Sequence, residues 1–63
     1  MTFILWRQDS GGAEVYVTGW SAQGGQAAYS NNRGDALRYE TRAAAEAAVA
    51  RSRHAGWQVR EVA

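Results

Sequence analysis

Few side chains in this sequence could carry out catalysis. His54 is the one histidine, and the chain has neither cysteine nor lysine. A catalytic His54 would need a serine and a carboxylate held beside it, but the nearest serine, Ser52, is two positions away on a predicted helix and points elsewhere. Positive charge is favoured near a helix C-terminus, which explains His54 without catalysis. We therefore predict that the protein is not an enzyme and has no catalytic residues.

Metal and cofactor sites are also not indicated. The six acidic residues are scattered singly, so no pair of carboxylates or cation cage is expected. A structural zinc site needs more histidine and cysteine than this chain contains. The pairs Gly11-Gly12 and Gly24-Gly25 do not have the strand-to-helix spacing of a phosphate-binding loop. We predict no metal and no cofactor.

Aromatic residues and arginines are the strongest functional signal. In the segment Glu14–Gln23, Val15 and Val17 fall on one side of an alternating pattern, and Tyr16 and Trp20 fall on the other. If the valines face a helix, the aromatic residues project from the opposite face of the sheet, where no second helix can cover them. An uncovered aromatic face is typical of an interface or a binding site. The predicted binding residues are Trp6, Arg7, Tyr16, Trp20, Tyr29 and Arg33.

Three kinds of partner fit such a face, and the sequence leaves all three open. Self-association would bury the face and supply the extra core that a chain of 63 residues needs. Capture of a host protein or protein complex would use tryptophan, tyrosine and arginine as anchors. A nucleotide or single-stranded nucleic acid could stack on the aromatic rings, with Arg7 or Arg33 against phosphate. The net charge of +1 does not favour a polyanion.

The elements that must position these side chains can be placed from turn and capping signals. A helix is predicted from about Thr41 to Ala55, because Thr41 can cap it and Gly56 can end it. The short segment Ala36–Glu40 is ambiguous, and we expect it to anchor a loop in the core. A tight hairpin is predicted at Gly24-Gly25, with Tyr29 nearly opposite Trp20. The predicted strands are Thr2–Gln8, Glu14–Gln23, Gln26–Ser30 and Trp57–Val62.

Alanine dominates the predicted helix and determines how it can pack. Ala44, Ala45, Ala48 and Val49 share one side at 100° per residue. Because alanine buries little surface, the helix must approach the sheet closely and meet large residues there. The predicted fold class is α+β, a single domain over residues 1–63, in which an antiparallel sheet of three to four strands packs one helix on one face in βββαβ order.

No segment looks like a membrane span or a leader. The longest uncharged run, between Val15 and Asn32, is interrupted by glycine, serine and glutamine and cannot cross a bilayer. The segment Met1–Arg7 lacks the basic start and the cleavage site of a signal peptide. We expect a cytoplasmic protein without membrane contact.

The stretch from Ala36 to Ala48, followed by Gly56-Trp57-Gln58-Val59, resembles small uncharacterised phage and bacterial domains. These have a β-meander, an alanine-plus-aromatic phrase before a capped helix, and a final strand after Gly-Trp or Gly-Tyr. In size and style the chain also resembles phage accessory proteins of the counter-defence, anti-CRISPR-like kind. The resemblance implies inhibition of a host defence complex by protein–protein contact in the host cytoplasm. It brings no catalytic residues with it.

Overall fold

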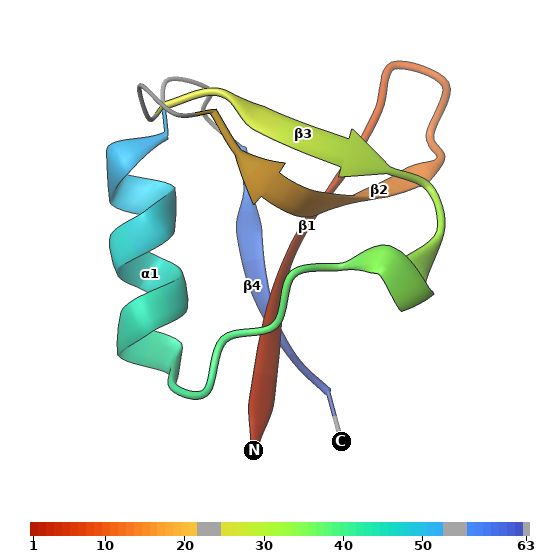
Figure 1. The fold of residues 1–63 in the computed structure, drawn as a ribbon. Helices are drawn as coiled ribbons and strands as arrows, with labels where there is room; N and C mark the ends of the chain where they lie inside the picture. The colour runs from red at the N-terminus through yellow and green to blue at the C-terminus, as the bar shows by residue number, and fades with distance from the viewer. Residues whose placement is uncertain (22–24, 53–55, 63) are drawn as a thin grey trace.

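Four strands, a short 3₁₀ helix and one α-helix make up the part of the chain that the structure, a computed structural model, describes. The described residues are 1–21, 25–52 and 56–62. The predicted α+β class is confirmed, with a four-stranded antiparallel sheet and one helix packed against it (Figure 1). In chain order the elements are β1 (Thr2–Gln8), β2 (Glu14–Trp20), β3 (Ala27–Ser30), η1 (Arg33–Asp35), α1 (Arg42–Arg51) and β4 (Gln58–Val62).

The strand β1 lies inside the sheet, whose spatial order is β3-β2-β1-β4. Trp6 is opposite Tyr16 of β2 on one side and Gln58 of β4 on the other. At the other end of β1, Thr2 is opposite Val62, so the two ends of the described chain lie side by side (Figure 1). The first and last strands are therefore partners in one ladder.

The α-helix begins as predicted and ends earlier. The Thr41 hydroxyl accepts a hydrogen bond from the Ala44 amide at 3.1 Å, which satisfies one of the free donors of the first turn. The helix ends at Arg51, because Ser52 has extended backbone angles (φ −67°, ψ 140°). The predicted helical end beyond Ser52 is therefore wrong. The predicted positions of residues 53–55, including His54, lie outside the described residues.

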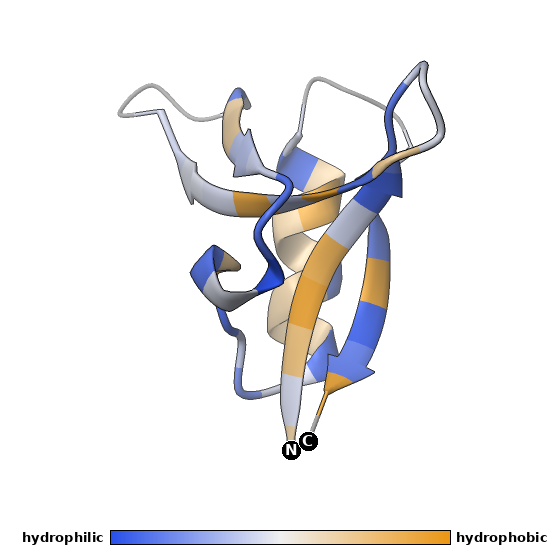
Figure 2. Ribbon diagram, turned by 90° about the vertical axis from the view of Figure 1, so that its right-hand side faces the viewer, coloured by the Kyte–Doolittle hydropathy of each residue, from blue (hydrophilic) through white to orange (hydrophobic). Residues whose placement is uncertain are grey.

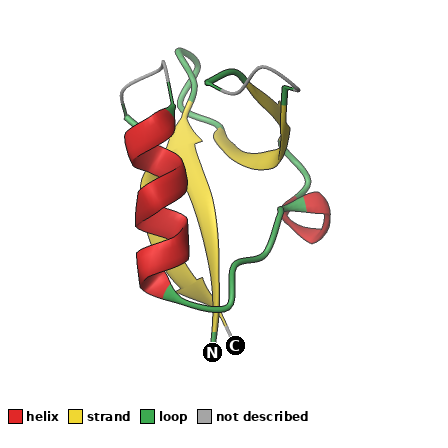
Figure 3. Ribbon diagram, turned by 60° about the vertical axis from the view of Figure 1, so that its left-hand side comes forward, coloured by secondary structure: helices red, strands yellow, loops and turns green. Residues whose placement is uncertain are grey.

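The main core lies between α1 and the sheet. Ala45 is fully buried there, and Ala48 and Val49 pack against the same core, so this side of the helix is the predicted one. Ala44 is exposed, in contrast to the prediction. Figure 3 shows the helix on one side of β1 and β4. The buried residues of this helix-side core are Phe3, Leu5, Val15, Val17, Ala45 and Trp57.

A β-bulge in β2 changes the side on which Trp20 lies. The register between β2 and β3 shifts between Val17 and Gly19, so the alternation of side chains is broken there. Trp20 consequently packs against the helix-side core with Val15 and Val17. The prediction that Trp20 lies on the opposite face is wrong, because period-two counting holds only while the ladder is regular.

The hairpin between β2 and β3 is wider than predicted. The strand β2 ends at Trp20, which is opposite Ala27, and the Ser21 amide donates to the Gln26 carbonyl at 2.9 Å. The connection therefore spans residues 22–25, where the sequence predicted a two-residue loop. Tyr29 is opposite Val17 and not near Trp20, as predicted.

The chain between β3 and α1 crosses the sheet face opposite α1 and anchors itself there. Ala36 is buried, the Leu37 amide donates to the Val17 carbonyl at 2.8 Å, and Tyr39 exchanges two 2.8 Å backbone hydrogen bonds with Phe3. The segment around Ala36–Glu40 thus anchors the loop in the core, as expected. Figure 3 shows η1 standing away from the helix, across β1 and β4.

Candidate functional site

The sheet face opposite α1, here called the far face, has its own small core. Ile4, Tyr16 and Ala36 are buried together, with Trp6 and Val62 packed against them. Tyr16 is only 6% exposed. The expectation that Tyr16 projects from an uncovered face is therefore wrong, because the connection to α1 brings Ala36 onto it. A coil segment covers the face that no second helix could cover.

Glu14 lies at the centre of a polar network on the far face. Its Oε1 atom accepts hydrogen bonds from the Tyr16 hydroxyl at 2.7 Å and from the Arg60 guanidinium at 3.0 Å. The hydrogen bond from Arg60, and then that from Tyr16, lowers the pKa of the Glu14 carboxyl, and the bond to Glu14 raises the pKa of the Tyr16 phenol. The guanidinium of Arg60 also lies over the Trp6 ring, 4.0 Å from its centroid.

The lowered pKa of Glu14 predicts a pH-dependent contribution to stability. The charged carboxylate stabilises the folded chain fully above its ordinary pKa of 4.5, and this stabilisation is lost as the pH falls through the lower folded value. Glu14→Gln should therefore destabilise the protein at neutral pH and become indistinguishable from the unmodified chain in strong acid. Urea unfolding at several pH values measures this. Glu46→Gln, at an exposed helix position, is the control, and a pH-independent effect of Glu14→Gln would contradict the prediction.

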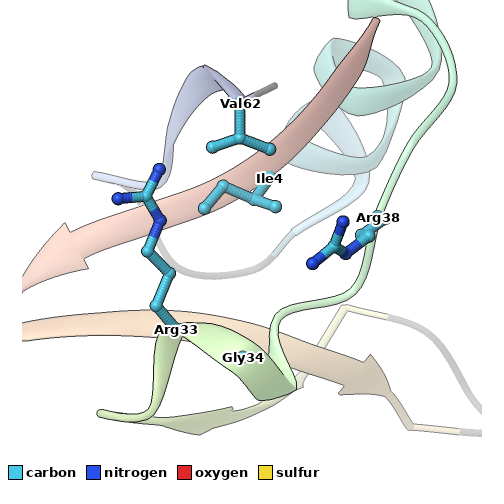
Figure 4. Close-up of a pocket in the computed structure, with 5 residues that line it drawn as sticks. All are labelled: Ile4, Arg33, Gly34, Arg38 and Val62. Atoms are coloured by element: carbon cyan, nitrogen blue, oxygen red, sulfur yellow. The ribbon is translucent and has the colours of Figure 1, made fainter.

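Next to this network lies a pocket of about 440 Å³ that we call the arginine pocket. Ile4 of β1 and Val62 of β4 give it an apolar floor. Arg33 and Arg38 extend along its two sides, as Figure 4 shows. Neither arginine has an ion pair or a hydrogen bond with any described residue. The lining residues are Ile4, Arg33, Gly34, Arg38 and Val62.

Local hydrogen bonds hold the backbone that carries the two arginines. The Asn32 side chain accepts from the Gly34 amide at 3.0 Å and caps η1, and the Asn32 amide donates to the Ser30 hydroxyl at 3.0 Å. On the other side of η1, the Leu37 amide bonds to β2. Arg33 and Arg38 are both exposed, so their backbone is fixed while their guanidinium groups face solvent. Figure 2 shows this hydrophilic segment beside the apolar middle of β1.

The structure divides the predicted binding residues between the two sides of the sheet. Trp6, Tyr16 and Arg33 belong to the far face, although Arg60 covers Trp6 and Tyr16 is buried. Arg7 and Tyr29 come together on the helix side, where the Arg7 guanidinium lies 5.6 Å from the Tyr29 ring centroid. Trp20 donates from its indole to the Tyr39 hydroxyl at 2.8 Å and is half-buried. The six residues therefore form no single aromatic surface.

Sequence reasoning did not identify Arg38, Ile4 or Val62 as neighbours of Arg33. The floor residues lie on the first and last strands, and only the β1–β4 pairing brings them together. One signal in the sequence points to the arginines: Asn32 is a capping residue type, so a short capped turn flanked by Arg33 and Arg38 could have been expected. The pairing of these two side chains around a pocket required the tertiary structure.

The remaining tests of function found no match. Among the residues that the structure describes, no three metal-ligating side chains of histidine, cysteine, aspartate or glutamate gather in one place. In the same residues no helix has the length and apolar character that crossing a membrane requires. Comparisons with protein-family models, curated proteins and solved structures found nothing that matches this chain.

Proposed function

We propose that this chain is a non-enzymatic binding protein that captures an acidic segment of a partner protein in the arginine pocket. The observation that supports the proposal is the pair Arg33 and Arg38, which flank an apolar floor and have no ion pair among the described residues. A carboxylate between the guanidinium groups would gain charge-assisted hydrogen bonds. An aliphatic side chain next to that carboxylate would cover Ile4 and Val62.

The charges around the pocket favour a protein carboxylate over a nucleic acid backbone. The acidic residues Asp35 and Glu40 lie exposed on the same connection as the two arginines. They would repel a continuous chain of phosphates, whereas a single carboxylate can avoid them. The net charge of +1 acts in the same direction, because polynucleotide binding usually needs a strongly basic surface.

The wider role suggested by the resemblance stays a prediction. A host defence complex is one protein partner that could present an acidic, apolar-flanked segment. Self-association has less support than the sequence suggested, because Tyr16 is buried within one chain and Trp6 is covered by Arg60. Stacking of bases on Trp6 and Tyr16 loses support for the same reason.

Peptide titration followed by NMR tests the proposal. Blocked peptides containing Leu-Glu should shift the backbone resonances of Ile4, Gly34 and Val62, and Leu-Gln peptides should bind much more weakly. Arg33→Gln and Arg38→Gln should each weaken binding by about tenfold, the size of one charge-assisted hydrogen bond. Binding should also weaken as salt is added.

The matched control is Arg51→Gln, which removes the same charge from an exposed position at the end of α1. It should leave peptide affinity unchanged. The proposal fails if Arg51→Gln weakens binding as much as the pocket variants do, or if Leu-Gln peptides bind as well as Leu-Glu peptides. A preference for oligonucleotides over acidic peptides at the same resonances would also overturn it.

A further inference from the structure

A second arginine without a counter-ion lies on the other side of the sheet. Arg7 is opposite Val15, and Tyr29 is opposite Val17, so both share the helix side with these buried valines. The Arg7 guanidinium carbon lies 4.8 Å from the centroid of the Trp57 ring and 5.6 Å from that of Tyr29. The two rings are themselves 6.4 Å apart and tilted by 56°. We call Arg7, Tyr29 and Trp57 the Arg7 cluster.

The rings hold the Arg7 guanidinium without satisfying its hydrogen-bond donors. A cation over an aromatic face is attracted by the ring but donates no hydrogen bond within the guanidinium plane. The Nε atom of Arg7 is fully buried and has no partner, and the same is true of Nε1 of Trp57. No ion pair to Arg7 occurs in the described residues. Buried donors are nearly always satisfied in folded proteins, so two unsatisfied ones in contact indicate a position where an acceptor is missing.

The two Nη atoms of Arg7 are the donors that a ligand can reach. They are not among the fully buried unpartnered atoms, and no described residue accepts a hydrogen bond from them. Guanidinium groups present their donors in a planar fork that matches the oxygen atoms of carboxylate and phosphate. Because the rings already restrict Arg7, little further side-chain entropy is lost when an anion binds.

Tyr29 adds a surface for a flat group next to this anion position. It is 57% exposed, far more than Trp57 at 5%, and it lies on the edge strand β3. Aromatic side chains bind nucleic acid bases by stacking, and any base can take part because all have a π-face. An aromatic ring that ends in an arginine fork therefore fits a ligand that joins a planar heterocycle to one anionic group.

We propose that the Arg7 cluster binds a nucleoside monophosphate, with the base stacked on Tyr29 and the phosphate on the Nη atoms of Arg7. The site lies on the face of the sheet opposite the arginine pocket and does not depend on the function proposed for that pocket. It takes a small ligand and not a polynucleotide, because one arginine supplies the anion contact.

Titration with AMP, GMP, CMP and UMP, followed in ¹H–¹⁵N spectra, tests the site. The Nε–H signal of Arg7 and the Nε1–H signal of Trp57 should shift on addition of a mononucleotide at millimolar concentration. Adenosine alone and inorganic phosphate alone should each bind at least about fivefold more weakly than AMP, since each lacks one of the two contacts. The proposal is overturned if no mononucleotide shifts these two signals.

Three variants separate the two contacts from a general loss of structure. Tyr29→Leu should weaken AMP binding by at least about fivefold, and Tyr29→Phe should restore it, because the ring and not the hydroxyl stacks. Tyr29 is exposed, so these variants keep the fold. Arg7→Lys should also weaken binding, because lysine cannot present the planar fork. Unchanged affinity in Tyr29→Leu, or loss of AMP binding in Arg33→Gln, would overturn the proposal.

Discussion

Leu5→Ala should lower the free energy of unfolding by about 2–5 kcal/mol, the range for truncating a buried leucine. Leu5 is 0% exposed in the helix-side core. Alanine would lose the transfer free energy of the removed carbons and leave a cavity, because the paired strands around it cannot collapse. A domain of 63 residues has a total stability of roughly 3–9 kcal/mol, so the variant should be largely unfolded near body temperature.

Urea unfolding followed by circular dichroism measures this effect, with Leu37→Ala as the matched control. Leu37 has the same side chain but is half-buried, and its hydrogen bond to Val17 involves only the backbone. We expect its truncation to cost no more than about 1 kcal/mol. Equal losses for the two variants would contradict the assignment of Leu5 to the centre of the core.

Ala45→Leu should destabilise the chain by about 1–3 kcal/mol, although it adds hydrophobic surface. Ala45 is 0% exposed where α1 packs against β1 and β4. A larger side chain there would push the helix away from the sheet, since close packing leaves no room for three more carbons. Intrinsic helix propensity contributes little, because leucine is nearly as good a helix former as alanine.

Ala47→Leu is the control for the helix prediction. Ala47 is exposed on the same helix, so the same substitution should change the free energy of unfolding by only a few tenths of a kcal/mol. Thermal unfolding of both variants measures the difference. If Ala45→Leu were as stable as Ala47→Leu, the close approach of the helix to the sheet would be wrong.

Much of the fold could be predicted because its signals are local. The bounds of β1 follow from a run of β-formers that ends at a turn, and the start of α1 follows from the hydroxyl of Thr41. The inward side of the helix at Ala45 follows from its period. Each of these depends on residues within a few positions of one another, where backbone sterics and capping hydrogen bonds act.

The candidate sites were predicted less well because they depend on contacts between distant segments. Arg33 was identified, but its partner Arg38 and the floor formed by Ile4 were not. Arg7 and Tyr29 were chosen for an exposed aromatic face, yet the structure places them with Trp57 on the helix side. Residue type alone shows that a side chain can bind, and the tertiary structure shows which side chains meet.

The sequence by itself determined the α+β class, the strand and helix order, the capped start of α1 and its alanine side, because each arises from local periodicity and capping. Only the tertiary structure decided the two faces of the sheet. The bulge between Val17 and Gly19 turns Trp20 toward the helix-side core. The connection through Ala36 buries Tyr16 on the far face. Both outcomes follow from strand register and from long-range packing, which no local pattern encodes.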